Sequence, residues 1–342
     1  MRSPSDLTQD PVSWDEAVIA SGGHFLQSWG WGEFKSKFGW DVARVAVDGA
    51  AGPGLAQMLV RRKAGVSVGY IPRGPVHPDH ADGFRLWQGI GREALRQRAL
   101  FVIVEANEPL PDGLEQAARL SAGPAHIQPA RTVKVPLVDD DALLKQMHQK
   151  TRYNVRLAQR RGVIVRRASH DSAEVDAFYA LMLDTAERNQ FGVHERRYYA
   201  EFLQTFGDNA ALLFAEIEGK PVAGVIAVCF GDEAIYMYGA SSTKDRAHGA
   251  GFVIQFEAMR WAREQGCRMY DLWGIPAVDP SSTHVNDGDR IAGTSGSDWR
   301  GLYEFKTRFG GQIVSYPAPL ERIYVPGLAH LAKRIYPIGG GE

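Results

Sequence analysis

The sequence predicts an α/β protein built from two domains of one fold. Helix-like and strand-like segments alternate, and the order helix, helix, strand, strand, strand, helix, strand occurs twice. A chain of 342 residues also has room for two domains at roughly 100–200 residues each. We place the first domain at residues 1–145, completed by residues 317–342, and the second at residues 146–316.

The first occurrence of this order runs from residue 11 to residue 106. Two helices are expected, near Pro11–Ser21 and over the aromatic-rich stretch 25–40. Alternating apolar residues predict strands at 41–47 and 54–63, on either side of the turn DGAAGPG, and a third at 66–76. A helix over 79–98 and a buried strand at 99–106 follow, and then a short helix at 112–121 and a strand at 131–137.

The second occurrence runs from residue 171 to residue 275. Helices are expected at 171–189 and 196–206, and two strands lie within 211–230 around a tight Glu-Gly-Lys turn. A third strand is expected at 234–242. Phe252, Phe256 and Met259 recur at helical spacing and predict an amphipathic helix over 251–266, before a last strand at 268–275.

Composition restricts the class of protein. The chain is 44% hydrophobic and 23% charged, which is typical of globular domains, and its net charge of −1 means that any nucleic-acid binding needs a local basic patch. The two cysteines, Cys229 and Cys267, exclude a disulfide framework; we expect buried free thiols, although one bridge stays open. Without an apolar signal core or a membrane-length apolar run, we expect a cytoplasmic protein.

The segment KTRYNVRLAQRRGVIVRR (150–167) is such a patch. It holds seven basic residues in eighteen and no acidic residue. On a helix, Arg152, Arg156 and Arg160 share one face, because they are spaced four apart. A solvated helical face explains the pattern as readily as a phosphate backbone does, and both interpretations stay open.

Few familiar catalytic motifs occur. The sequence lacks GxxxxGK[ST], HExxH and GxSxG, which argues against Walker-type nucleotide binding, zincin chemistry and a hydrolase elbow. HPDH (77–80) lacks further ligands nearby, so we expect no metal. RAHGAG (246–251) lies between a strand and a helix and resembles the acyl-CoA-binding loop of the GCN5-related N-acetyltransferase fold, although a ligand-free helix start explains it too.

Two segments near the end of the second domain are unusual. Residues 276–299 are rich in Gly, Ser and Asp and are interpreted as a long loop. GLYEFKTRFGG (301–311) then sets Lys306 and Arg308 among three aromatic residues. An amphipathic turn explains that pattern, and so does a site for something flat and anionic, such as the end of an RNA.

Six phrases in series carry a resemblance to a known family. They are FLQSWGWGEFKSKFGW, GYIPRGPV, KTRYNVRLAQRRGV, YMYGASS, YDLWGI and GLYEFKTRFGG, and they span about residues 24–316. Together they resemble the Fem (FemABX) family of peptidoglycan bridge-forming aminoacyltransferases, in its FemX-like form without a coiled-coil arm. The resemblance implies two tandem acetyltransferase-like domains with mixed sheets flanked by helices.

The resemblance also implies an activity. Members take an amino acid from aminoacyl-tRNA and attach it to the stem-peptide amine of a cell-wall precursor, so the expected partners are aminoacyl-tRNA and UDP-MurNAc-pentapeptide or its lipid-linked form. No cofactor is expected beyond aminoacyl-tRNA as co-substrate. Glycine, alanine and serine all stay open as the transferred residue.

Residue roles follow from the same resemblance. Lys306 and Phe305 match a pair that handles the tRNA acceptor end and the transferred ester, and Glu105 is the candidate acid near the substrate amine, with Glu108 as competitor. The expected substrate-binding residues are Lys35 and Arg196 at the diphosphate (Arg197 is one step away), with Tyr238, Trp29 and Tyr199. The expected tRNA-binding residues are Lys150, Arg152, Arg156 and Arg160.

The chemistry suits these residue types. Aminolysis of an ester needs a neutral amine, and a carboxylate can orient an ammonium group and accept its proton. A fixed cation such as Lys306 can neutralise the developing or leaving oxygen, and Phe305 can stack on a terminal adenine. Two alternatives stay open: a CoA-dependent N-acyltransferase that uses RAHGAG, and an RNA-binding protein on an inactive transferase scaffold.

Overall fold

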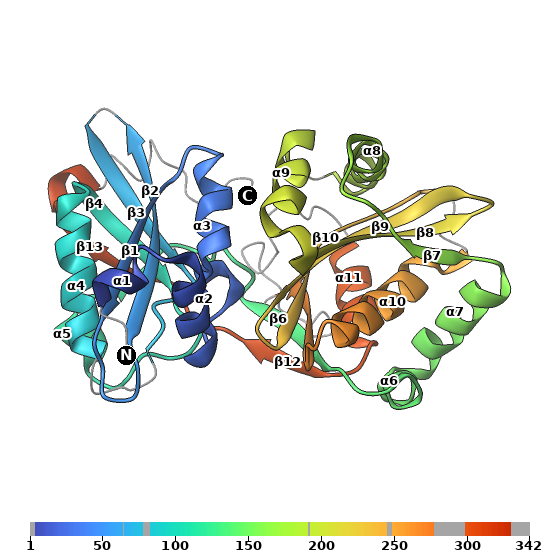
Figure 1. The fold of residues 1–342 in the computed structure, drawn as a ribbon, viewed down its shortest axis with the longest axis horizontal. Coiled ribbons are helices and arrows are strands. Elements are labelled where there is room, and N and C mark those ends of the chain that lie inside the picture. The colour runs from blue at the N-terminus through green and yellow to red at the C-terminus, as the bar shows by residue number, and fades with distance from the viewer. Residues whose placement is uncertain are drawn as a thin grey trace. The chain divides into compact units, whose positions relative to one another are not determined.

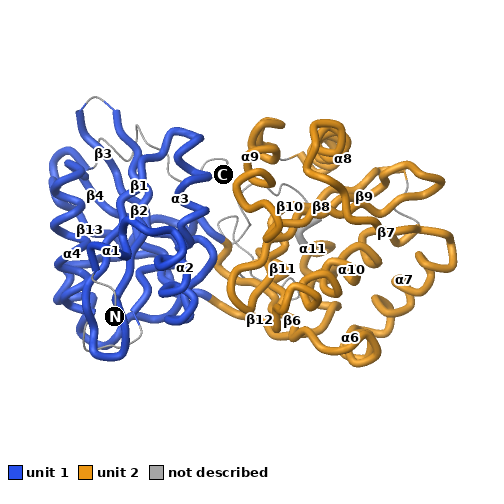
Figure 2. Tube along the Cα trace, in the orientation of Figure 1, with its two compact units in different colours: residues 1–128, 316–340 blue, residues 129–315, 341–342 orange. Residues whose placement is uncertain are grey.

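A computed structural model describes residues 4–63, 65–77, 83–190, 192–244, 248–276 and 298–329. It divides the chain into two compact units, coloured separately in Figure 2. Unit 1 holds residues 1–128 and 316–340, and unit 2 holds residues 129–315 and 341–342. The boundary therefore lies earlier than residue 145, because the strand at 131–136 pairs within the sheet of unit 2.

Unit 1 is a six-stranded mixed sheet with helices. Its elements are α1 (Pro4–Leu7), α2 (Pro11–Ala20), η1 (Phe25–Gln27), α3 (Trp29–Ser36), β1 (Asp41–Val47), β2 (Gly54–Lys63), β3 (Val66–Pro72), α4 (Gly83–Arg96), β4 (Ala99–Glu105), α5 (Leu114–Ala117), β5 (Ser121–Ala122) and β13 (Leu320–Ile323). The strand order is β1-β2-β3-β4-β13-β5, so the C-terminal segment returns to this unit beside β4 (Figure 1).

Unit 2 is a seven-stranded mixed sheet in the order β12-β6-β11-β10-β9-β8-β7. Its elements are β6 (Arg131–Pro136), α6 (Asp140–Gln146), α7 (Gln149–Arg160), β7 (Ile164–Arg167), α8 (Ser172–Asn189), α9 (Arg196–Phe206), η3 (Gly207–Asn209), β8 (Ala210–Ile217), β9 (Lys220–Phe230), β10 (Glu233–Ser241), α10 (Ala250–Glu264), β11 (Met269–Ile275), α11 (Asp298–Thr307) and β12 (Gln312–Ser315).

The two units repeat one topology, which confirms the predicted α/β class. Three antiparallel strands (β1-β2-β3 and β8-β9-β10) are followed by a helix (α4 and α10) and a strand parallel to the third (β4 and β11). In each unit an antiparallel strand from a distant segment, β13 or β6, then pairs with the outer parallel strand.

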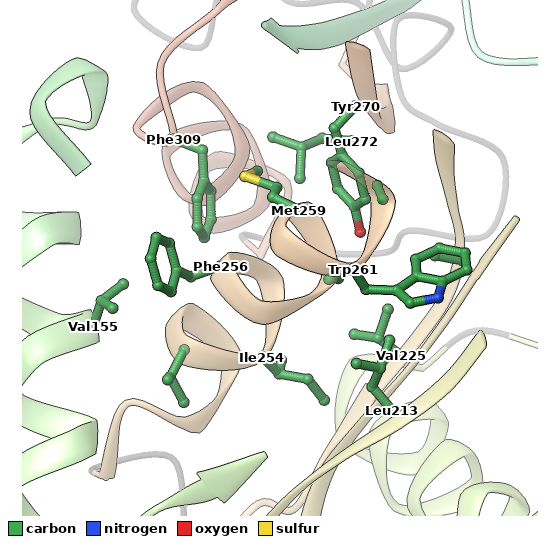
Figure 3. Close-up of a cluster of buried hydrophobic side chains, with 14 of the residues drawn as sticks. Val155, Leu213, Val225, Ile254, Phe256, Met259, Trp261, Tyr270, Leu272 and Phe309 are labelled. Atoms are coloured by element: carbon green, nitrogen blue, oxygen red, sulfur yellow. The ribbon is translucent and has the colours of Figure 1, made fainter. Parts of the chain in front are cut away.

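The sheet of unit 2 has a helix-covered core on both faces. Leu213 and Val225 pack with Ile254 of α10 on one face (Figure 3). On the other face Gly224 lies so close to Phe178 of α8 that an added Cβ would sit 2.7 Å from the ring. Gly224 and Val225, neighbours on β9, thus face opposite sides of the sheet, because successive side chains of a strand point in opposite directions.

Several predicted elements differ in extent. The stretch 25–40 is two helical pieces instead of one, because Ser28 ends η1 and caps α3 by accepting a hydrogen bond from the Trp31 N–H. The helix expected at 112–121 is only four residues long. The basic segment 150–167 is a helix only as far as Arg160; its last four residues form β7 and pair with β8.

Candidate functional site

The site begins where the parallel strands β10 and β11 stop pairing. Their ladder holds three pairs and ends at Ile235–Asp271, although both strands continue. Each strand is irregular just beyond that point: β10 shifts register at Met237, between Tyr236 and Tyr238, and β11 shifts against β6 between Asp271 and Gly274. Beyond Asp271, β11 no longer pairs with β10, while Gly274 and Ile275 still pair with β6, so the two parallel strands separate at this point.

Lys306 of α11 contacts β11 beyond this point. Its ammonium nitrogen donates a hydrogen bond to the Gly274 carbonyl at 2.8 Å and lies 5.4 Å from the centre of the Tyr236 ring. The side chain is 6% exposed. Burial lowers the pKa of Lys306 to about 7, and the charge of Asp271 acts in the opposite direction. The amine is therefore near half-protonation at neutral pH, which is the condition for exchanging protons with a substrate.

A glutamine of α10 joins a tyrosine of β10 and a tyrosine of β11 by hydrogen bonds at the same place. The buried Gln255 hydrogen-bonds the Tyr236 hydroxyl and accepts a hydrogen bond from the Tyr270 hydroxyl at 3.1 Å. Burial raises the pKa of Tyr236 to about 12, so this phenol stays neutral under Lys306. The sequence analysis did not select Tyr236 or Gln255, although Gln255 is a polar residue on the apolar face of α10.

A buried carboxylate is the second functional group that the sequence analysis missed. Asp271 is fully buried, and its Oδ1 accepts hydrogen bonds from the Thr132 hydroxyl and from the Trp273 N–H at 2.6 Å. Burial raises the pKa of Asp271. An acid inside the otherwise apolar strand text YDLWGI was the signal that could have found it.

Phe305 is part of the core as well as of the site. Its ring lies 5.2 Å from the rings of both Phe252 and Phe309, and it packs half-buried against the hydrophobic core. An added Cβ on Gly251, in the first turn of α10, would lie 3.9 Å from this ring. The aromatic cluster of GLYEFKTRFGG is thus largely structural, and it fixes α11 against the start of α10.

The predicted substrate-binding residues of unit 2 are only partly brought together. Tyr238 and Tyr199 meet edge-to-face at 5.2 Å. Arg196 instead points to α8, where it forms an ion pair with Asp176 and hydrogen-bonds Ser172 at 2.6 Å. The alternative, Arg197, pairs with Glu201 on its own helix at 3.5 Å.

Lys35 and Trp29 lie in unit 1. Lys35 is 2% exposed, and its nitrogen lies 5.5 Å from the Trp31 ring centre and 6.0 Å from that of Trp40. Trp29 lies under the Arg44 guanidinium at 3.3 Å. Each of the two cations thus lies near indole rings: Lys35 of α3 near Trp31 and Trp40, and Arg44 of β1 near Trp29.

Glu105 is held by structural hydrogen bonds. It is fully buried, and its carboxylate accepts from the Tyr70 hydroxyl and from the N–H groups of Ile127 at 2.9 Å and Gln128 at 3.0 Å. These bonds tie the end of β4 to the chain just before the unit boundary. Its competitor Glu108 is exposed in the following loop.

The basic face of α7 is exposed, with one exception. Lys150, Arg156 and Arg160 lie on the surface, beside Tyr153, which is 55% exposed. Arg152 instead donates to the carbonyls of the last residues of α6 and its cap, each at 3.3 Å. A surface hollow follows this helix and is lined by Gln149, Arg152, Tyr153, Arg156, Gln159 and Arg160.

Parts of other motifs lie outside the described residues: residues 246–247 of RAHGAG, residues 277–297 of the long loop, and residues 78–80 of HPDH. Gly249 begins α10 with a φ of 76°. Among the described residues, no helix combines the length and apolarity needed to span a bilayer.

These features define a class: a protein of two tandem acetyltransferase-like α/β units with a buried lysine where the second sheet opens. The FemAB family model matches residues 123–221 and 218–321, more than half of the chain. The chain therefore belongs to the FemAB family.

Named relatives agree with this membership. The lipid II:glycine glycyltransferase of Staphylococcus epidermidis (strain ATCC 35984) is 22% identical over 396 aligned residues, covering 92% of this chain and 91% of the relative. The Staphylococcus aureus protein of the same name is 24% identical over 402, covering 92% and 91%.

Solved structures agree on the fold. A crystal structure of FemX matches with a TM-score of 0.80 at 20% identity, covering 94% of this chain and 98% of that one. A tandem GNAT protein from the clavulanic acid pathway matches with a TM-score of 0.54 at 12% identity, covering 94% and 97%.

Proposed function

We propose that this protein transfers an amino acid of the glycine, alanine or serine class from aminoacyl-tRNA to the stem-peptide amine of a peptidoglycan precursor. Family membership and relatives named as lipid II:glycine glycyltransferases support this. Those names make the lipid-linked precursor the first acceptor to test. The observation that carries the proposal is Lys306, a buried amine with a pKa of about 7 where β10 and β11 separate.

Lys306 suits both proton movements of the reaction. The attacking amine must lose a proton as its nitrogen bonds to the ester carbonyl, and the ribose oxygen must gain one as its bond to that carbon breaks. A group with a pKa near the working pH does both with little penalty. The ammonium form also stabilises negative charge on the ester oxygen, because burial keeps water from screening it.

The RNA would approach along unit 2. The exposed basic face of α7 offers Lys150, Arg156 and Arg160 to phosphates. The middle of α7 packs on the start of α10: a Cβ on Gly249 would lie 3.1 Å from the Asn154 carbonyl. The first turn of α10 in turn contacts Phe305, next to Lys306. Packed elements thus connect the basic helix with the proposed reaction centre.

The acceptor would use the remaining predicted residues. In unit 1, Lys35 is proposed for the diphosphate. In unit 2, Tyr238 is proposed to contact the precursor, and the buried Tyr199 supports it by packing edge-to-face against its ring. Arg196 can join them only by exchanging its ion pair with Asp176 for the ligand. That pair is partly solvent-exposed, so the exchange costs little.

The decisive experiment is transfer of labelled amino acids from a mixed aminoacyl-tRNA pool, first to lipid II and then to UDP-MurNAc-pentapeptide. We expect transfer that RNase abolishes, and the label then identifies the amino acid. Transfer to neither acceptor, together with acylation of a peptide amine by acetyl-CoA, would overturn the proposal in favour of a CoA-dependent N-acyltransferase.

A further inference from the structure

We propose that Asp271 is the positioning residue for Lys306. Its side chain shapes the bulge of β11, which is the register shift between Asp271 and Gly274 that presents the Gly274 carbonyl to Lys306. Its negative charge favours the protonated amine. The inference rests on the proposed function only for its kinetic consequence. Its structural part concerns the chain alone.

The bulge depends on the Asp271 side chain. Oδ1 accepts from the N–H of Trp273, two residues further on, which is the hydrogen bond of an Asx turn. Trp273 has a φ of 61°, a left-handed conformation that is uncommon for a residue with a side chain. The turn therefore makes up for local backbone strain and sets the direction in which β11 continues.

The same oxygen also fixes the bulge to the neighbouring strand. The Thr132 hydroxyl of β6 donates to Oδ1, and Thr132 is the residue that pairs with Gly274 once the register is restored. One carboxylate oxygen thus joins the two sides of the irregularity. Because Lys306 donates to the Gly274 carbonyl at 2.8 Å, the place of its ammonium group depends on this arrangement.

Asp271 is the charge that acts on Lys306, although Lys134 acts on Asp271 more strongly than Lys306 does. Lys134 of β6 and Lys306 of α11 both favour the charged carboxylate, and Glu233 of β10 lies on the same face. Lys134, however, already pairs with Glu233 at 2.7 Å. Within the described part of the chain, Oδ2 of Asp271 has no hydrogen-bond partner.

Lys306 in turn has little else to keep it charged. Burial lowers its pKa, and Asp271 is the group that raises it. The Tyr236 ring, 5.4 Å from the ammonium nitrogen, is neutral, and so is the Gln255 amide that hydrogen-bonds its hydroxyl. Loss of the Asp271 charge should therefore deprotonate Lys306 at a lower pH.

The test is a titration of Lys306 by NMR of protein labelled with ¹³C at lysine Cε, with Lys306→Met to assign the signal. Asp271→Asn keeps an oxygen that can accept the Trp273 and Thr132 bonds and removes only the charge. We expect the midpoint to move down by about one pH unit or more. Asp232→Asn is the matched control, because that carboxylate is on the surface in an ion pair with Arg268.

A midpoint that stays in place or rises in Asp271→Asn overturns the proposal. Should this variant fail to fold, Thr132→Val removes one hydrogen bond from the carboxylate, so Asp271 is charged less of the time and a smaller downward move is expected; no move again overturns it. The NMR titration needs no transfer reaction, so its failure is distinct from failure of the proposed function. Where transfer is observed, the alkaline limb of the kcat profile should move with the NMR midpoint while KM changes little.

Discussion

The parallel strand pairs of the two units differ at their ends. In unit 1, β3 and β4 pair as far as Pro72–Glu105, and the Gly74 N–H then donates to the Glu105 carbonyl at 3.2 Å. The buried amide of Gln27 closes this end further by donating to the Pro72 carbonyl at 2.7 Å. In unit 2 the equivalent strands, β10 and β11, pair over three residues only. Beyond them the Lys306 ammonium group donates a hydrogen bond to the Gly274 carbonyl of β11.

The polar groups at the two strand ends therefore have different roles: those of unit 1 stabilise the fold, and those of unit 2 are candidates for chemistry. The polar groups at the closed end satisfy one another, so they hold the fold and are unavailable to a substrate. The open end keeps a lysine and a carboxylate buried at a cost in stability, which is typical of a functional site. Duplication of one topology thus gives one unit whose strand ends are joined by hydrogen bonds and one whose parallel strands separate beside a buried lysine.

The largest expected effect is on transfer by Lys306→Met. Removing a group that exchanges protons with the substrate should lower kcat by about 10²–10⁴-fold. Lys220→Met, at an exposed turn of the same unit, is the matched control and should behave as wild type. Wild-type rates in Lys306→Met, measured with the same labelled acceptor, would show that the open end is not the reaction centre.

The second prediction concerns stability against pH. The pKa of Lys306 is about 7 in the folded chain and 10.5 in the unfolded chain, so between these values the unfolded state binds more protons and stability rises with pH. Relative to Lys306→Met, the wild type should gain about 3 kcal/mol in free energy of unfolding between pH 7 and pH 10.

Urea denaturation of both proteins across this pH range provides the measurement. The Lys220→Met protein should follow the wild type at every pH. A constant difference between wild type and Lys306→Met would mean that the buried amine titrates normally.

The third prediction concerns the closed end. Glu105→Gln places an amide N–H against donors that the carboxylate now accepts from, and should lower the free energy of unfolding by about 1–3 kcal/mol. Glu108→Gln is the control and should change little. If Glu105 acts instead as the acid near the substrate amine, its variant would lose transfer activity at full stability, and the contrast between the units would fail.

Periodicity and turn chemistry predicted most of the fold, because the two repeats of strand and helix patterns are local. Four-residue spacing predicted the basic face of α7, whereas Lys306 was selected by the family resemblance and by its place in GLYEFKTRFGG. The roles of both stay predictions. These patterns missed Asp271 although an acid in apolar strand text is a local signal. What the residue contacts depends on a register shift against β6, which no local pattern predicts. Helical spacing selected Arg152 and the family resemblance selected Arg196, and neither predicted the partners that these residues have near the end of α6 and on α8. Their binding roles stay predictions.

The smallest expected effect sharpens the assignment of RNA to unit 2. Replacing Lys150, Arg156 and Arg160 by Gln should weaken tRNA binding and lower the log–log salt slope by about 0.7–0.9 for each lost phosphate contact. Arg152→Gln should instead lower the free energy of unfolding by about 1 kcal/mol, because its guanidinium group already donates to carbonyls at the end of α6. The salt slope of tRNA binding should change little in this variant. Filter binding at several salt concentrations measures both. An unchanged slope in the triple variant would remove α7 from the RNA path and leave the start of α10 as the approach to Lys306.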